Sequence, residues 1–88
     1  MDTETWRELI TEELDKQNER WIDIEAITLS DAELDKPFDS GFGGEEGKPF
    51  TAWTLKRVYF PICYDGSEWC GSVSRIIDNQ PTDHLGGG

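Results

Sequence analysis

The chain has 88 residues, of which 35% are hydrophobic, and a formal net charge of −11 at pH 7, which leaves room for one domain with a modest core. Four Trp, four Phe and two Tyr argue against disorder, because disordered chains contain few aromatic residues. The charge argues against direct binding of nucleic acid or an anionic membrane, and the acidic N-terminal sequence, without a signal peptide or a membrane-length apolar run, predicts a cytoplasmic protein with reduced cysteines.

Residues 4–19 are predicted to form an amphipathic helix. Thr5 and Glu8 have the spacing of a capping box at its start. Its apolar side chains recur at the helical period and form one stripe: Trp6, Leu9, Ile10 and Leu14. A second stripe on another face is acidic: Glu4, Glu8, Glu12, Asp15 and Glu19. Like charges at this spacing weaken a helix slightly, so we expect solvent or a partner to compensate for them.

The segment after this helix predicts short elements and a loop. Residues 22–26 alternate apolar and acidic side chains, which favours a half-buried strand, although their Glu and Ala also fit a helix. Ser30 and Glu33 form a second capping box and predict a short helical turn that Pro37 ends. The "GFGG" at residues 41–44 lacks the Lys-Ser/Thr of a phosphate-binding loop and is flanked by acids, so we interpret it as a connector.

Residues 50–75 carry β-strand signals. Residues 50–54 predict a short strand, and residues 57–64 and 68–75 predict two longer ones. The intervening Asp-Gly is a strong hairpin signal. For each loop that fits, the numbers of two opposed residues sum to 131 or 133, and both sums are odd. Odd-numbered residues of the first strand therefore share a face with even-numbered residues of the second strand.

This parity divides the hairpin into two faces. One face is apolar and comprises Val58, Phe60, Ile62, Tyr64, Trp69, Gly71 and Val73. The other is mixed and comprises Tyr59, Pro61, Cys63, Cys70 and Ser72. We expect the apolar face to lie on the helix, because apolar area is what a packed layer buries. In the 133 register Cys63 is directly opposite Cys70.

The two cysteines are interpreted as small packed thiols. Their Cys-x6-Cys spacing does not fit structural zinc, and His84 is the one imidazole that could join them. A cross-strand disulfide is geometrically feasible, but a reducing compartment opposes it. No nucleophile has an evident base beside it, and nothing in the sequence raises the pKa of a particular carboxyl group. We therefore expect no catalytic residue, no metal and no cofactor.

The acidic residues are concentrated in the N-terminal half. Residues 1–47 contain fifteen acids and four bases, whereas residues 48–88 contain four of each. One interpretation is a solvated face, and another is a surface that mimics nucleic-acid phosphates and occupies a basic groove. One helix presents a carboxylate about every 6 Å, against one charge per ~1.7 Å of duplex DNA, so mimicry requires several segments to converge. The expected partner-binding residues are Glu8, Glu12, Asp15, Glu19, Asp23 and Glu25, supported by Asp31, Glu33 and Asp35.

The stretch "PFTAWTLKRVYFPICYDGSEWCGSVSR", with "PFDSGFGGEEG" before it, resembles a family of small proteins carried by bacteriophages and prophages. The resemblance covers half to two-thirds of the chain and implies no activity, cofactor or catalytic residue. It implies a context, because small acidic phage proteins are often inhibitors of host defence nucleases, including anti-CRISPR and anti-restriction proteins.

Taken together, the patterns predict a single α+β domain over residues 1–78, with a flexible tail over residues 79–88. In this domain an N-terminal helix packs on an antiparallel sheet of three or four strands. The expected core comprises Trp6, Ile10, Leu14, Ile22, Ile24, Trp53, Val58, Phe60, Ile62, Trp69 and Val73.

The leading functional hypothesis is a non-enzymatic phage protein that inhibits a host nucleic-acid-binding defence complex, such as a CRISPR or restriction effector. It would occupy a basic surface of that complex with its acidic half. The alternative is an interaction module that binds a partner through the aromatic sheet face, with Tyr59 or Tyr64 in contact and the acidic half serving only solubility. A small hydrolase or metal-dependent enzyme is a third hypothesis. A monomer and a homodimer both remain open.

Overall fold

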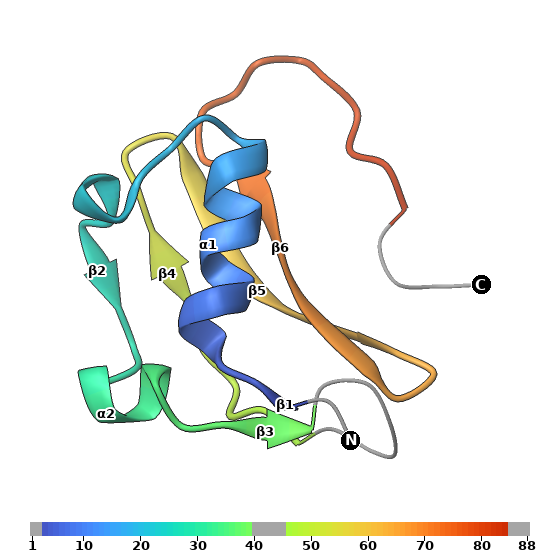
Figure 1. The fold of residues 1–88 in the computed structure, drawn as a ribbon. Coiled ribbons are helices and arrows are strands. Elements are labelled where there is room, and N and C mark those ends of the chain that lie inside the picture. The colour runs from blue at the N-terminus through green and yellow to red at the C-terminus, as the bar shows by residue number, and fades with distance from the viewer. Residues whose placement is uncertain (1–2, 40–45, 85–88) are drawn as a thin grey trace.

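One long helix lies against a four-stranded antiparallel sheet in the computed structural model, which describes residues 3–39 and 46–84 (Figure 1). The strands of this sheet, in spatial order, are β2 (Ala26–Ile27), β4 (Ala52–Trp53), β5 (Arg57–Tyr64) and β6 (Ser67–Ser74). A separate antiparallel pair joins β1 (Thr3–Glu4) to β3 (Phe38–Asp39). The predicted α+β class, with a helix on an antiparallel sheet, is confirmed.

Helix α1 (Trp6–Lys16) begins at the predicted capping box and is shorter than the predicted helix at both ends. The Thr5 hydroxyl accepts from the Glu8 amide at 3.2 Å, and the Glu8 carboxylate accepts from the Thr5 amide at 3.0 Å. The helix ends before Asn18, whose φ of 57° lies in the left-handed region that Asn tolerates at a helix terminus. This reversal turns the chain back toward the edge of the sheet.

The strand predicted for residues 22–26 is wrong. A single turn of 3₁₀ helix, η1 (Trp21–Asp23), occupies its first half, and β2 begins only after it. The Asp23 carboxylate accepts from the Arg20 amide at 2.8 Å and so closes this turn. Asp often prefers such a local bond to an extended ladder. As a consequence Ile22, expected in the core, is 80% exposed.

The second capping box is confirmed. Ser30 is the N-cap of α2 (Asp31–Leu34). Its hydroxyl accepts from the Glu33 amide at 3.2 Å, and the Glu33 carboxylate accepts from the Ser30 amide at 2.8 Å. The buried side chain of Leu34 fixes this turn onto the core. The connector predicted at residues 41–44 lies outside the described residues.

The hairpin has the predicted turn and parity. Asp65 and Gly66, with φ angles of 51° and 82°, form the two-residue type I′ turn that Asp-Gly favours. Opposed residue numbers along β5 and β6 sum to 131. Cys63 is therefore directly opposite Glu68 rather than Cys70, and both thiols are free.

The helix packs on the face of the sheet opposite to the predicted one. The side chains that α1 covers come from the mixed face and its continuation on β4: Ala52, Tyr59, Glu68, Cys70 and Ser72, all buried. The face expected to be inward is only half-buried at Val58, Phe60, Trp69 and Val73. The reason is that α1 and the turn after it direct two carboxylates, Glu13 and Glu19, at the sheet. Buried carboxylates need hydrogen-bond donors, and the Tyr59 and Ser72 hydroxyls of the mixed face supply them.

The core lies between α1 and this mixed face. Its buried members are Trp6, Leu9, Ile10, Leu14, Leu29, Leu34, Phe50, Ala52, Tyr59 and Cys70. Trp6, Ile10 and Leu14 were predicted, and Ile24 packs partly against the cluster as expected. The expected members from the other sheet face, Trp53, Val58, Phe60, Ile62, Trp69 and Val73, lie outside the cluster. At the N-terminal end of α1 the Trp6 ring contacts the rings of Phe38 and Phe50, with centroids 5.0 and 4.8 Å apart.

Candidate functional site

One face of the four-stranded sheet is apolar and has no layer packed on it among the described helices and strands. We call it the open face, and its residues are Trp53, Val58, Phe60, Ile62, Tyr64, Trp69 and Val73. The strand register makes these side chains neighbours, since Val58 pairs with both Trp53 and Val73, and Ile62 pairs with Trp69. The sequence grouped the hairpin members of this face correctly but placed them on the wrong side of the sheet.

Side chains of the open face pack mainly on one another. The Ile62 side chain lies directly over Gly71, because a Cβ added to Gly71 would be 2.2 Å from the Cδ1 atom of Ile62. This close packing explains why Ile62 is only 8% exposed. Tyr64, next to the turn, is 47% exposed. A sheet face of partly exposed apolar side chains with no further layer on it is a candidate site for another macromolecule.

Glu19, expected on the partner surface, is instead buried beneath the helix terminus. Its carboxylate accepts from the Tyr59 hydroxyl at 2.5 Å and from the Thr54 hydroxyl at 3.1 Å. Tyr59 is fully buried, and burial together with the adjacent Glu19 charge raises the pKa of its phenol. Glu19 and Tyr59 therefore hold the domain together and are not presented to a partner.

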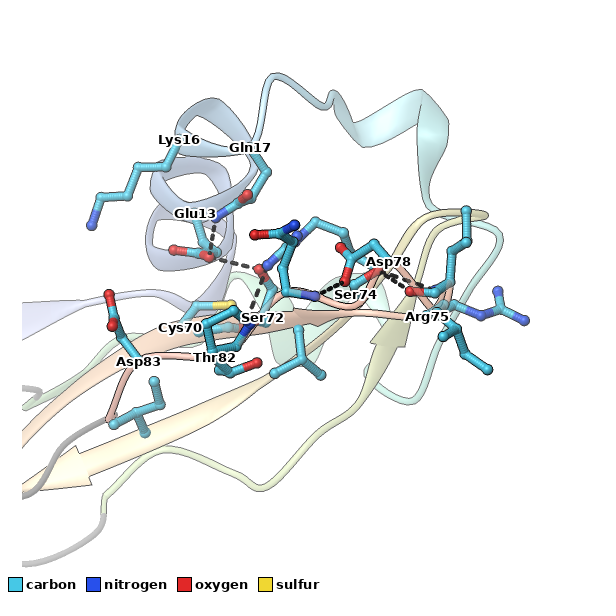
Figure 2. Close-up of a pocket in the computed structure, with 18 of the residues that line it drawn as sticks. Glu13, Lys16, Gln17, Cys70, Ser72, Ser74, Arg75, Asp78, Thr82 and Asp83 are labelled. Atoms are coloured by element: carbon cyan, nitrogen blue, oxygen red, sulfur yellow. Dashed lines mark hydrogen bonds between the residues drawn. The ribbon is translucent and has the colours of Figure 1, made fainter.

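Glu13 forms a second buried network with β6, shown in Figure 2. Its carboxylate accepts from the Ser72 hydroxyl at 2.7 Å and from the Gln17 side-chain amide at 3.0 Å. The Ser72 hydroxyl also accepts from Arg57 Nε at 2.8 Å, so both of its hydrogen-bonding directions are occupied. Burial, followed by the Glu13 charge, raises the pKa of the neighbouring Cys70 thiol to about 12. A raised pKa keeps the Cys70 thiol protonated and therefore weakly nucleophilic.

Glu68 is a third buried carboxylate that sequence reasoning missed. It accepts from the backbone amides of Glu46 and Gly47 at 2.7 and 3.0 Å and ties this segment to the hairpin. A signal was present, because Glu68 has the parity of Cys70 and Ser72 on the mixed face. Its role is structural.

The remaining predicted acids divide into separate groups. Glu8, Glu12 and Asp15 are exposed on α1, and Glu8 also serves the capping box. Asp23 and Glu25 are exposed near β2 and border a hollow of about 200 Å³. Of the six leading predicted residues, the structure thus buries Glu19 and leaves the other five exposed, three on α1 and two in the segment before β2.

The three supporting acids around α2 are paired within the chain. Arg7 Nε lies 2.6 Å from an Asp35 oxygen, and Arg7 Nη2 lies 3.6 Å from Asp31. The Arg7 guanidinium lowers the pKa of Asp35. Lys48 forms a salt bridge with Glu33 and, with the Ser30 backbone, lowers the pKa of Glu33 to about 2. Internal bases thus reduce the charge that these acids offer to a partner.

Comparison with protein-family models, with curated proteins and with solved structures gave no match. The resemblance to small phage proteins therefore stays a prediction. Within residues 3–39 and 46–84, no helix is long and apolar enough to cross a membrane. The same residues contain no group of three or more His, Cys, Asp or Glu side chains arranged to hold a metal ion.

Proposed function

We propose that the protein is a non-enzymatic binding module that docks a protein partner on the open face. The observation that carries the proposal is an apolar sheet face, centred on Trp53, Phe60 and Trp69, that lies outside the core cluster. Large aromatic side chains contribute most of the binding energy of typical interfaces. Covering this face would remove from water the part of its apolar area that folding leaves exposed.

The proposed partner is a basic protein with an apolar patch, rather than a second copy of the chain. Each chain carries a net charge of −11, so two copies repel each other as they approach. The same charge attracts a basic surface and accelerates the encounter. In this role the exposed acids Glu8, Glu12 and Asp15 steer the partner and need not touch it.

Substitution on the open face tests the proposal. The tagged wild-type chain serves to capture a partner from host lysate, and the purified pair then gives a dissociation constant. We expect Phe60→Ser to weaken binding at least ~tenfold, the effect of losing an interface aromatic, while circular dichroism shows the fold retained. Ile22→Ser, at an equally apolar side chain away from this face, is the matched control and should bind normally. Equal affinity of Phe60→Ser and wild type would overturn the proposal.

A second candidate is the inhibitor that the phage resemblance implies, with the acidic helix in a basic groove of a host nucleic-acid-handling complex such as a CRISPR effector. It is favoured by one observation: Glu12 and Asp15 are exposed on α1 and form no salt bridge among the described residues. The discriminating variant is Glu12→Arg/Asp15→Arg/Glu25→Arg, which spares the capping carboxylates. Loss of binding in this variant with a steep salt dependence, and unchanged binding of Phe60→Ser, would select the second candidate.

A further inference from the structure

Strand β6 is a long edge of the sheet, with no strand beyond it in the described part of the chain. It has eight residues, whereas β2 at the opposite edge has two. Exposed edges are normally protected by Lys, Pro, a bulge or a covering segment. The sequence of β6, SEWCGSVS, contains neither Lys nor Pro, and its pairing with β5 runs through all eight positions without a bulge. Its one charged side chain, Glu68, points inward beside the turn and bonds to the Glu46 and Gly47 amides, so the part of the edge that remains without such protection begins at Trp69.

The hairpin turn fixes which backbone groups of β6 face outward. In a two-residue type I′ hairpin the residues that flank the turn, Tyr64 and Ser67, form a hydrogen-bonded pair, and bonded and non-bonded pairs then alternate. Pro61, which has no N–H, opposes Cys70 in a non-bonded pair, as this alternation requires. The β6 residues whose N–H and C=O point away from β5 are therefore Glu68, Cys70, Ser72 and Ser74.

These outward groups are almost entirely unused. Arg57 donates to the Ser72 carbonyl at 3.2 Å, and among the described residues no partner is found for the outward amides of Cys70, Ser72 and Ser74. A groove of about 680 Å³ runs along this edge, between β6 and residues 75–83 (Figure 2). In the described part of the tail beyond Ile76, no hydrogen bond joins it to β6. The edge thus has unsatisfied backbone donors and acceptors, and the groove beside it has room for another segment.

We propose that β6 receives an extended segment of the basic partner as a fifth, antiparallel strand of the sheet. This inference rests on the proposed function and deepens it, because a fifth strand continues the open face. Its residues opposite Trp69 and Val73 would extend the apolar surface, so apolar side chains fit there. Its residues opposite Cys70 and Ser72 would lie beside α1, among small side chains and the Glu13 carboxylate, where hydroxyl side chains fit. Lysines at its ends would be attracted by the net charge of −11 of the whole chain, since the groove itself is lined by as many bases as acids.

A peptide of this pattern, Lys-Thr-Val-Thr-Val-Thr-Val-Lys with blocked termini, is the probe. Amide hydrogen exchange followed by NMR should show the Cys70, Ser72 and Ser74 amides exchanging fast in the free protein. Their protection should rise about tenfold when free peptide is present at ~10 times its dissociation constant. N-methylation of the three Thr residues removes the donors that face β6 and should abolish the effect. N-methylation of the Val residues, whose amides face away, should preserve it.

Several outcomes overturn this inference. They are the absence of binding, equal binding of the two N-methylated peptides, and equal binding of a peptide with Glu in place of both Lys residues. Protection of the outward amides in the free protein would instead identify a second copy, if sedimentation shows a dimer, or the chain's own tail, if truncation of residues 79–88 removes it. With the captured partner, Ser74→Pro should weaken binding and Ser74→Ala should not. If Phe60→Ser abolishes partner binding while the edge amides stay unprotected in the complex, the proposed function stands and the fifth strand fails.

Discussion

The two faces of the same sheet differ in a way that reverses the usual pattern. The face covered by α1 presents the polar groups of Tyr59, Ser72 and Glu68, whereas the open face presents Trp, Phe and Val side chains. Burying one large apolar side chain contributes roughly 1.5–3 kcal/mol. Burying an amide or hydroxyl without a hydrogen-bond partner costs roughly 2–7 kcal/mol, and an unpaired carboxylate costs more.

These magnitudes explain which face the helix selects. Glu13 and Glu19 point from the helical segment into the layer beneath it, where the Ser72 and Tyr59 hydroxyls of the mixed face donate to them. The Val, Ile and Phe side chains of the open face offer no such donor. Hydrogen-bond satisfaction therefore decides the packing here, and apolar area remains on the outside for a partner.

The largest expected effect on stability comes from a substitution in the core, compared with one on the open face. Ile10→Ala, under the helix, should lower the free energy of unfolding by about 2–5 kcal/mol, because it leaves a cavity in a fully buried site. Phe60→Ser, on the open face, should cost less, about 2 kcal/mol, since its ring is only partly buried in the free protein. Urea unfolding monitored by circular dichroism measures both. Equal losses would mean that the open face is part of the folding core.

Much of the local structure could be predicted from short-range rules. The capping boxes at Thr5 and Ser30, and the Asp65–Gly66 turn, depend on residues at most three positions apart. The turn also fixes the parity of the hairpin. The strand predicted at residues 22–26 failed because the Asp23 side chain closes a local turn, which alternation alone does not reveal.

The candidate site was predicted only in part, because its side of the sheet depends on contacts between distant residues. The sequence grouped Val58, Phe60 and Trp69 on one face. Their exposure, however, depends on two hydrogen bonds between distant residues: Glu13 and Ser72 are 59 positions apart, and Glu19 and Tyr59 are 40 positions apart. One signal was available in advance. Glu13 falls within the apolar stripe of α1, so the opposing sheet face had to supply a donor.

A smaller effect on stability is expected from removing a tyrosine hydroxyl on the mixed face, compared with one on the open face. Tyr59→Phe should destabilise the protein by about 1–3 kcal/mol, since it removes a donor from the buried Glu19 carboxylate. Tyr64→Phe removes the same hydroxyl from an exposed side chain, and its effect should stay within ~0.5 kcal/mol. Thermal and urea unfolding of both variants provide the measurement. A neutral Tyr59→Phe would show that Thr54 alone satisfies Glu19.

The smallest expected effect concerns the ion pairs around α2, which lie on the protein surface and on neither face of the sheet. Lys48 and the Ser30 backbone lower the pKa of Glu33 from 4.5 to about 2. A depressed folded-state pKa contributes stability that is complete above the unfolded value and is lost as the pH falls through the folded value. The loss should therefore occur between about pH 4.5 and pH 2, and Lys48→Met should make the decline in that window shallower. Lys56→Met, at an exposed lysine without a salt bridge among the described residues, should keep the wild-type decline. An unchanged profile for Lys48→Met, measured by urea unfolding across this pH range, would show that solvent screens the pair completely.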